Sequence, residues 1–159
     1  MNLPKRKPTR LKDFDYSTEG YYFITICTHN KQKFLCDIVG EGLCALPKIK
    51  LTHIGKIVYE SIEYMEQNNK NIFIDKFVIM PNHIHLIIEN QTGGHGDPPL
   101  QIYDVIGNFK SFTTHKYGDT LWQRSFHDHV IRGDADYLKI WEYIDTNPKK
   151  WKEDCFYTE

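Results

Sequence analysis

The chain has 159 residues, a formal net charge of −1, and 40% hydrophobic and 14% aromatic residues. This length predicts one domain, and this composition excludes a disordered chain. No apolar run approaches the roughly 18 residues that a membrane span needs, and the first twelve residues (MNLPKRKPTRLK) lack the apolar core of a signal peptide. Four cysteines without a CxxC pair predict reduced thiols in a cytoplasmic protein, not a zinc framework or a set of disulfides.

Two basic segments stand out against an acidic background. Residues 1–12 carry five basic residues and no acid, and residues 109–132 carry a net charge of +2. We expect residues 1–12 to form a mobile basic arm ahead of a single domain over 13–159. Local positive patches can hold phosphates even when the total charge is close to zero.

Strands and helices alternate in the predicted order of elements. β-Branched and aromatic runs predict strands, and apolar residues at helical spacing predict helices. In chain order, we expect a strand over 21–28, an extended segment over 34–39, a helix over 52–67 capped by Thr52, strands over 72–80 and 83–89, a helix over 100–117 that stops at Gly118, a strand over 121–131, and a helix that Asp134 caps and that runs to about 147. A turn at Pro81–Asn82 makes the middle strands a hairpin. This order predicts an α+β fold, a ferredoxin-like antiparallel sheet with helices packed on it.

His83 and His85 form the first candidate site. Side chains alternate between the faces of a strand, so both imidazoles face one side and Ile84 faces the other. Two imidazoles at this spacing can share one metal ion, or they can be polar residues on a solvated face. His127 and His129 have the same spacing, and periodicity does not choose between the pairs. The apolar residue inside the first pair mildly favours it, because an acid separates the second.

Tyr143 and Asn147 form the second candidate site. They are four residues apart on a predicted helix and therefore share one face. Pro148 disfavours helical backbone at the preceding residue, which puts Asn147 in the last turn. Its amide oxygen could ligate a hard cation. The alternative is that Tyr143 is a packing residue and Asn147 a helix cap.

Four successive blocks of the sequence resemble those of the REP-associated tyrosine transposases, which belong to the single-tyrosine HUH transposases of bacterial insertion sequences. The blocks are MPNHIHLII (80–88), GNFKSFTTHKY (107–117), LWQRSFHDHVIR (121–132) and YIDTNPKKW (143–151). The segment YYFITICTHN (21–30) resembles that family's opening strand. The resemblance extends over about residues 11–157, and it implies the ferredoxin-like HUH fold.

The resemblance also implies a role for each candidate residue. His83 and His85 match the His-hydrophobic-His motif that holds Mg²⁺ or Mn²⁺, and the apolar centre of that motif excludes the pair separated by an acid. Tyr143 matches the catalytic tyrosine. Asn147 matches the polar residue that completes the metal site, where many insertion-sequence relatives have Gln. Two imidazoles and an amide bind such ions loosely, so we expect weak metal binding in the absence of DNA.

The function implied by the resemblance is a metal-dependent transposase and endonuclease. It would cleave and rejoin single-stranded DNA next to a hairpin through a 5′-phosphotyrosine intermediate, as a homodimer or as a monomer. Two alternatives stay open, namely a domesticated, non-catalytic protein that binds hairpin DNA, and a metal-dependent hydrolase that activates water.

Basic residues are the expected DNA contacts, although residues of this kind are more often solvated surface charges. Those in the arm would grip the phosphate backbone, and those in the second basic segment would add to that grip. The candidates are Lys5, Arg6, Lys7 and Arg10 in the arm, and Lys110, Lys116, Arg124 and Arg132 in the second segment.

Overall fold

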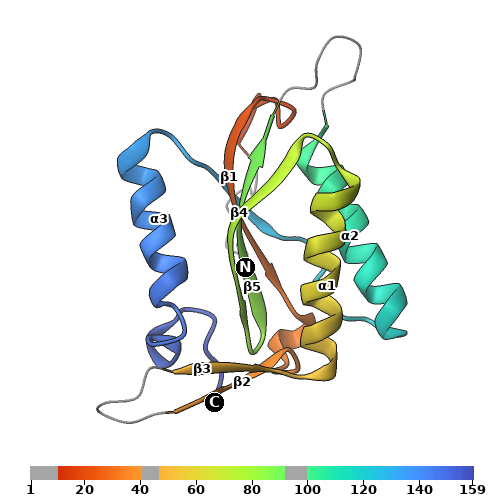
Figure 1. Cartoon of the computed structure of the whole chain (residues 1–159), viewed down its shortest axis with the longest axis vertical. Coiled ribbons are helices and arrows are strands. Elements are labelled where there is room, and N and C mark those ends of the chain that lie inside the picture. Colours follow the sequence, from red (N-terminus) through yellow and green to blue (C-terminus); the bar gives the residue numbers. More distant parts are fainter. Residues whose placement is uncertain (1–10, 41–46, 92–99) are drawn as a thin grey trace, which may run out of the picture.

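A four-stranded antiparallel sheet forms the centre of the computed structural model, which describes residues 11–40, 47–91 and 100–159 (Figure 1). Its strands are β1 (Gly20–Cys27), β4 (Ile72–Met80), β5 (His83–Asn90) and β6 (His127–Val130), in the spatial order β4-β5-β1-β6. In this order each of the two crossover connections skips one strand, which is the split βαβ arrangement of ferredoxin-like folds. The predicted α+β fold is therefore confirmed.

Helices cover both faces of the sheet. Figure 1 shows α1 (His53–Asn68) and α2 (Ile102–Tyr117) together on one face and α3 (Asp134–Thr146) on the other. One hydrophobic core lies between the sheet and the α1–α2 pair, and a smaller core lies under α3. The sheet is therefore buried on both sides over much of its area.

The alternation along β5 decides which residues face each helix layer. Ile84, Leu86 and Ile88 belong to the core under α1 and α2, whereas Ile87 belongs to the core under α3. His83 and His85 share the parity of Ile87, so their side chains face α3. The strand therefore carries two polar side chains into a buried layer.

The helix boundaries follow the predicted signals closely. The Thr52 hydroxyl accepts a hydrogen bond from the Gly55 amide at 3.0 Å, as expected of the residue that caps α1. Gly118 ends α2 with a φ of 86°, a left-handed conformation that favours glycine. The prediction that Asp134 caps α3 was wrong. Gly133 occupies the N-cap position, and Asp134 is the first residue of the helix.

The strand expected over 121–131 is much shorter than predicted. Leu121 and Trp122 are buried in the core, where the Trp122 indole donates a hydrogen bond to Thr113 at 2.6 Å. Trp122 also forms an isolated antiparallel bridge with Thr28, so the predicted pairing is present there, but the continuous strand begins only at His127. A second hairpin, β2 (Cys36–Val39) with β3 (Lys48–Leu51), includes a strand that was not predicted.

Two short 3₁₀ helices, η1 (His29–Lys31) and η2 (Trp151–Glu153), complete the described elements. The second begins a C-terminal segment that returns toward the β4–β5 turn, where the Asn82 amide donates a hydrogen bond to the Phe156 carbonyl at 2.8 Å. Among the described residues, no helix has both the length and the apolar character that crossing a membrane requires.

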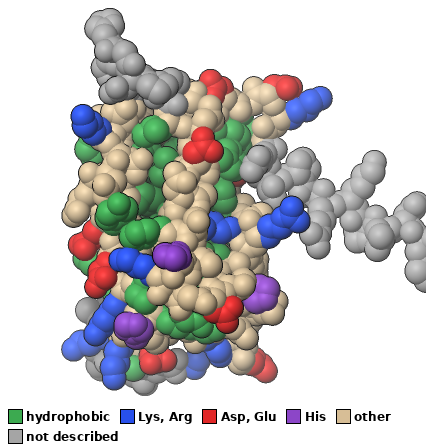
Figure 2. Space-filling view, turned by 90° about the vertical axis from the view of Figure 1, so that its right-hand side faces the viewer, with side chains coloured by type: hydrophobic (Ala, Val, Ile, Leu, Met, Phe, Trp, Pro, Cys, Tyr) green, Lys and Arg blue, Asp and Glu red, His purple; other side chains and the backbone are tan. Residues whose placement is uncertain are grey.

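Hydrophobic side chains, drawn in green, gather on the side of the molecule that carries α1 and α2 (Figure 2). Tyr64 and Phe112 stack with their ring centroids 4.7 Å apart, and the Lys116 amine lies 4.7 Å from the Phe112 centroid. This surface lies on the opposite side of the sheet from His83 and His85.

Candidate active site

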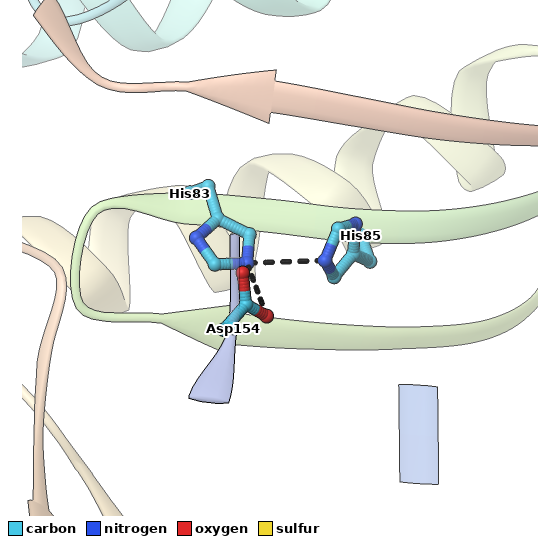
Figure 3. A group of neighbouring side chains, drawn as sticks. All are labelled: His83, His85 and Asp154. Carbon is cyan, nitrogen blue, oxygen red and sulfur yellow. Dashed lines mark hydrogen bonds and ion pairs between the residues drawn. The ribbon is translucent and has the colours of Figure 1, made fainter. Parts of the chain in front are cut away.

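Two buried imidazoles meet at the start of β5 (Figure 3). His83 and His85 are each 0% exposed, and their Nε2 atoms are 3.0 Å apart. The alternation of side chains along the strand brings both rings to the α3 face, as the sequence predicted. Two ring nitrogens at this distance need a shared proton or a shared cation between them.

A separate partner orients each imidazole through its other nitrogen. Asn82 directs its amide nitrogen toward backbone carbonyls, so its oxygen faces His83 Nδ1 at 2.8 Å. His83 therefore donates from Nδ1 and keeps a lone pair on Nε2. His85 Nδ1 lies 2.7 Å from the Thr25 hydroxyl. Contacts of this kind are the usual support of metal-binding histidines.

Burial keeps both imidazoles neutral near neutral pH. Loss of solvent lowers the pKa of His83 to about 4, although the nearby Asp154 carboxylate acts in the opposite direction. Burial, together with the neighbouring His83, also lowers the pKa of His85. The neutral imidazole is the form that binds a metal ion, so the pair needs no deprotonation before binding at neutral pH.

Asp154 is a site residue that the sequence reasoning missed. Its side chain is 0% exposed, and its Oδ2 lies 3.9 Å from His83 Nε2. The same oxygen accepts hydrogen bonds from the Tyr143 hydroxyl at 3.3 Å and from the Asn147 amide. Asp154 follows η2, outside any periodic element, and nothing in the local sequence separates it from the exposed Glu153 beside it. Only the return of the chain toward the β4–β5 turn reveals it.

Tyr143 lies beside the imidazole pair on α3. Its ring centroid is 5.2 Å from that of His85 and 6.1 Å from that of Phe23, and 37% of the residue is exposed. Burial of the phenol, and next the negative charge of Asp154, raise the pKa of Tyr143 above its ordinary value. The hydroxyl therefore stays protonated at neutral pH while it remains partly open to solvent.

Asn147 completes the group one turn after Tyr143. The residue is 2% exposed, and its amide nitrogen donates to Asp154. Its Oδ1 is buried and has no hydrogen-bond partner among the described residues. Buried amide oxygens are almost always paired. An unpaired oxygen at this place therefore indicates an acceptor available to a cation or a donor group.

These groups fit a divalent cation. Ligand atoms of His83, His85 and Asp154 all lie within 4.8 Å of one another, the one such cluster of three in residues 11–40, 47–91 and 100–159. Adjacent ligands about 2.1 Å from an octahedral ion lie about 3.0 Å apart, which equals the separation of the two Nε2 atoms. Nitrogen and carboxylate donors without a thiolate suit Mn²⁺ or Mg²⁺.

The rival histidine pair lies on the sheet edge without such a cluster. His127 and His129 are exposed on β6, and His129 Nε2 is hydrogen-bonded to an Asp136 carboxylate oxygen at 2.8 Å. His127 is opposite Thr25 in the β1–β6 register, so it belongs to the same face as His85.

The expected DNA-contacting residues are dispersed. Lys5, Arg6, Lys7 and Arg10 lie outside the described residues. The Lys110 amine donates to three backbone carbonyls of residues 123–125, at 2.6, 3.0 and 3.4 Å, and so anchors that loop. Lys116 lies on α2, across the sheet from the imidazoles, and Arg124 and Arg132 are exposed on either side of β6.

Comparison with known proteins finds a relative of similar sequence and a solved structure of similar fold. No protein-family model matches the chain. A Haemophilus influenzae protein described as uncharacterized is 34% identical to it, over 97% of this chain and 94% of that protein.

The solved structure of a REP-associated tyrosine transposase bound to a REP hairpin matches with a TM-score of 0.63 and 22% identity, over 95% of this chain and 74% of that one. A proposed transposase from Deinococcus radiodurans covers 86% of this chain and 97% of its own at 15% identity, with a TM-score of 0.46, too low to establish a common fold. This chain therefore has the fold of a REP-associated tyrosine transposase, and it belongs to the same family as the Haemophilus influenzae protein.

Proposed function

We propose that the chain is a metal-dependent transposase of single-stranded DNA that uses Tyr143 as its nucleophile. One observation carries this proposal: the Tyr143 hydroxyl and His83 Nε2 both contact the same oxygen of Asp154, at 3.3 Å and 3.9 Å. A phosphate bound beside the imidazoles would therefore lie close to the phenol. The fold shared with a transposase supports the same assignment.

The proposed cation site consists of the two Nε2 atoms, the Asp154 carboxylate and the unpaired Asn147 oxygen. A divalent ion bound there would supply Lewis-acid stabilisation to a phosphate oxygen. The protein's own contribution is to hold the imidazoles neutral and fixed, through Asn82 and Thr25, so that no reorganisation accompanies binding.

The nucleophile needs activation. Ionising a phenol of ordinary pKa costs about 4 kcal/mol at pH 7, and the raised pKa of Tyr143 increases this cost. The negative charge of Asp154 opposes ionisation of the Tyr143 phenol, and a cation bound beside Asp154 would offset that charge. Asp154 also accepts the phenol hydrogen bond, so it lies where the proton must leave. The free site should therefore be much less reactive than the site with cation and DNA.

The proposed reaction is a transesterification. The Tyr143 oxygen bonds to phosphorus, the bond to the 3′-oxygen breaks, and that oxygen leaves as a 3′-hydroxyl after taking up a proton. The 5′-phosphate stays on Tyr143, and a 3′-hydroxyl of another strand can reverse the step and join DNA. The phosphotyrosine bond conserves the energy of the broken phosphodiester bond, so rejoining needs no ATP.

We extend hairpin recognition to this chain from its structural neighbour, which was solved bound to a REP hairpin. The proposed substrate is a hairpin with a single-stranded flank that enters the site. Two other functions differ from this one in their products. A hydrolase would use the cation site to activate water, and a non-catalytic binder would leave the DNA intact.

A denaturing gel separates the three functions. Labelled single-stranded DNA with a hairpin is incubated with Mn²⁺ and either the parent protein or Tyr143→Phe. We expect a slowly migrating protein–DNA adduct with the parent and none with the variant. Tyr64→Phe, on the far face, is the matched control and should retain the adduct. Cleavage by the parent and by Tyr143→Phe would indicate the hydrolase, and DNA left intact and unattached by both would indicate the binder.

A further inference from the structure

A groove of about 330 Å³ lies beside Tyr143, along the flank of α3 and the turn after it. Its lining includes Lys139, Thr146, Asn147 and Lys150 as well as Tyr143 itself. This volume is at the lower end of the range of ligand pockets, about 300 to 1,000 Å³. The groove therefore suits part of a single strand and not a duplex. A role for it in binding DNA rests on the proposed function.

Two lysines flank Tyr143 along this groove. Lys139 precedes it by four residues and shares its helix face. Lys150 comes seven residues after it, and its backbone amide still bonds the Thr146 carbonyl at 3.2 Å, so the helical path continues to this point. At 1.5 Å per residue, the lysines lie about 6 Å before and about 10 Å after Tyr143 along the axis.

Both lysine side chains are available to a ligand. The residues are exposed, and neither amine has a hydrogen bond or an ion pair within the described residues. This distinguishes them from Lys110, whose amine is occupied by backbone carbonyls. The two amines therefore belong to residues on opposite sides of Tyr143 along the helix axis.

Carboxylates restrict where a phosphate can lie in the groove. Glu142 and Glu153 line it, and Asp154 closes its inner end. A phosphate is repelled by these acids except next to an ammonium group or a cation. Asn147 also lines the groove, and its buried oxygen has no partner among the described residues, which indicates an acceptor available to a ligand beside the groove.

We propose that this groove is a subsite for single-stranded DNA, in which Lys139 and Lys150 hold the phosphates on either side of the one that Tyr143 attacks. The two contacts would align the strand along α3 and hold the central phosphorus within reach of the phenol. Such positioning lowers the entropic cost of the attack.

Binding measurements in the Tyr143→Phe background test this subsite without any covalent step. The affinity for a fluorescent single-stranded oligonucleotide is measured with Mn²⁺ at several salt concentrations. Each phosphate contact contributes about 0.7 to the slope of log affinity against log salt for single strands. We expect Lys139→Gln and Lys150→Gln each to reduce the slope by about that amount. Lys149→Gln, the exposed neighbour outside the groove lining, should leave it unchanged.

The outcome for the subsite can be separated from the outcome for the proposed function. Equal slopes for the groove variants and the Lys149→Gln control would overturn the subsite, even if the parent protein forms an adduct. Reduced slopes only at Lys139 and Lys150 would support the subsite, even if the parent forms no adduct and the proposed chemistry fails. Urea unfolding of each variant excludes loss of fold as the cause.

Discussion

Asp154 connects the proposed nucleophile, Tyr143, to the proposed cation site through one carboxylate. It faces His83, accepts the Tyr143 hydroxyl and accepts the Asn147 amide. A buried carboxylate beside two neutral imidazoles contributes the only negative charge among these groups, so we assign it a large share of the attraction for a divalent ion.

Asp154→Asn should therefore weaken Mn²⁺ binding. We expect the dissociation constant to rise at least about tenfold, since losses of 10- to 100-fold result even from changes to the groups that support metal ligands. Isothermal titration calorimetry measures the effect, with Glu153→Gln as the control for a lost charge at the neighbouring exposed position. An affinity equal to that of the parent would remove Asp154 from the cation site.

The buried imidazoles also predict how stability depends on pH. In the unfolded chain a histidine has a pKa of about 6.5, whereas burial lowers that of His83 to about 4 in the fold. Between these values the unfolded chain binds more protons, so the free energy of unfolding must fall as pH falls from about 6.5 toward 4. It should be independent of these groups above that range.

Urea unfolding of the metal-free protein across pH 4–8 measures this loss. Each imidazole with a lowered pKa contributes a slope of up to about 1.4 kcal/mol per pH unit. Replacing His83 with Gln should flatten the profile. A profile that is flat below pH 6.5 in the parent would contradict the burial of the pair.

At the scale of elements, α3 positions the site by packing on the β4–β5 half of the sheet. Ile140 and Ile144 are buried under this helix, and the Lys76 amine lies 3.3 Å from the Trp141 ring centroid. Tyr143 is 37% exposed and does not belong to this core, so the position of its ring depends on how firmly Ile140 and Ile144 hold the helix. The helix must be held firmly for the phenol to stay beside His85.

Ile144→Ala should loosen this attachment. The residue is 1% exposed, and its truncation should cost about 2–5 kcal/mol of the free energy of unfolding. Chemical denaturation measures the loss, and the adduct yield should fall although no group that contacts DNA has changed. Leu138→Ala, at a site that is 63% exposed, is the control and should change stability by less than about 0.5 kcal/mol. Equal effects of the two changes would argue against this packing.

The elements with strong periodic patterns could be predicted from the sequence, and those set by distant contacts could not. Alternation placed His83 and His85 on one face, and helical spacing placed Tyr143 and Asn147 together. Asp154 has no such pattern, because its burial depends on the return of residues 151–158 toward the β4–β5 turn. The strand predicted over 121–131 is interrupted, because only Trp122 pairs, with Thr28, before the continuous strand begins at His127.

At the scale of the whole molecule, one chain contains both the proposed nucleophile and the proposed cation site. The His85 and Tyr143 rings lie 5.2 Å apart within the same copy. Catalysis therefore should not depend on a helix contributed by a second copy, whether or not the protein forms dimers.

Mixing two inactive variants tests this arrangement. Tyr143→Phe and His83→Ala each lack one half of the site, so an equimolar mixture should form no adduct if each chain uses only its own residues. The parent protein diluted to the same concentration is the positive control. Recovery of adduct in the mixture, up to about one quarter of the parent's sites on random pairing into exchanged dimers, would show that the helix acts in a neighbouring copy.

The most direct test of the proposed chemistry is the identity of the residue that becomes attached to DNA. The protein is incubated with Mn²⁺ and a hairpin DNA with a single-stranded flank, digested with nuclease and protease, and sequenced by mass spectrometry. We predict a 5′-phosphonucleotide on Tyr143. This modification should not form when a chelator is present during the incubation, nor in the His83→Ala variant. DNA cleaved without any modified peptide, or a nucleotide attached to another residue, would contradict the assignment of Tyr143 as the nucleophile.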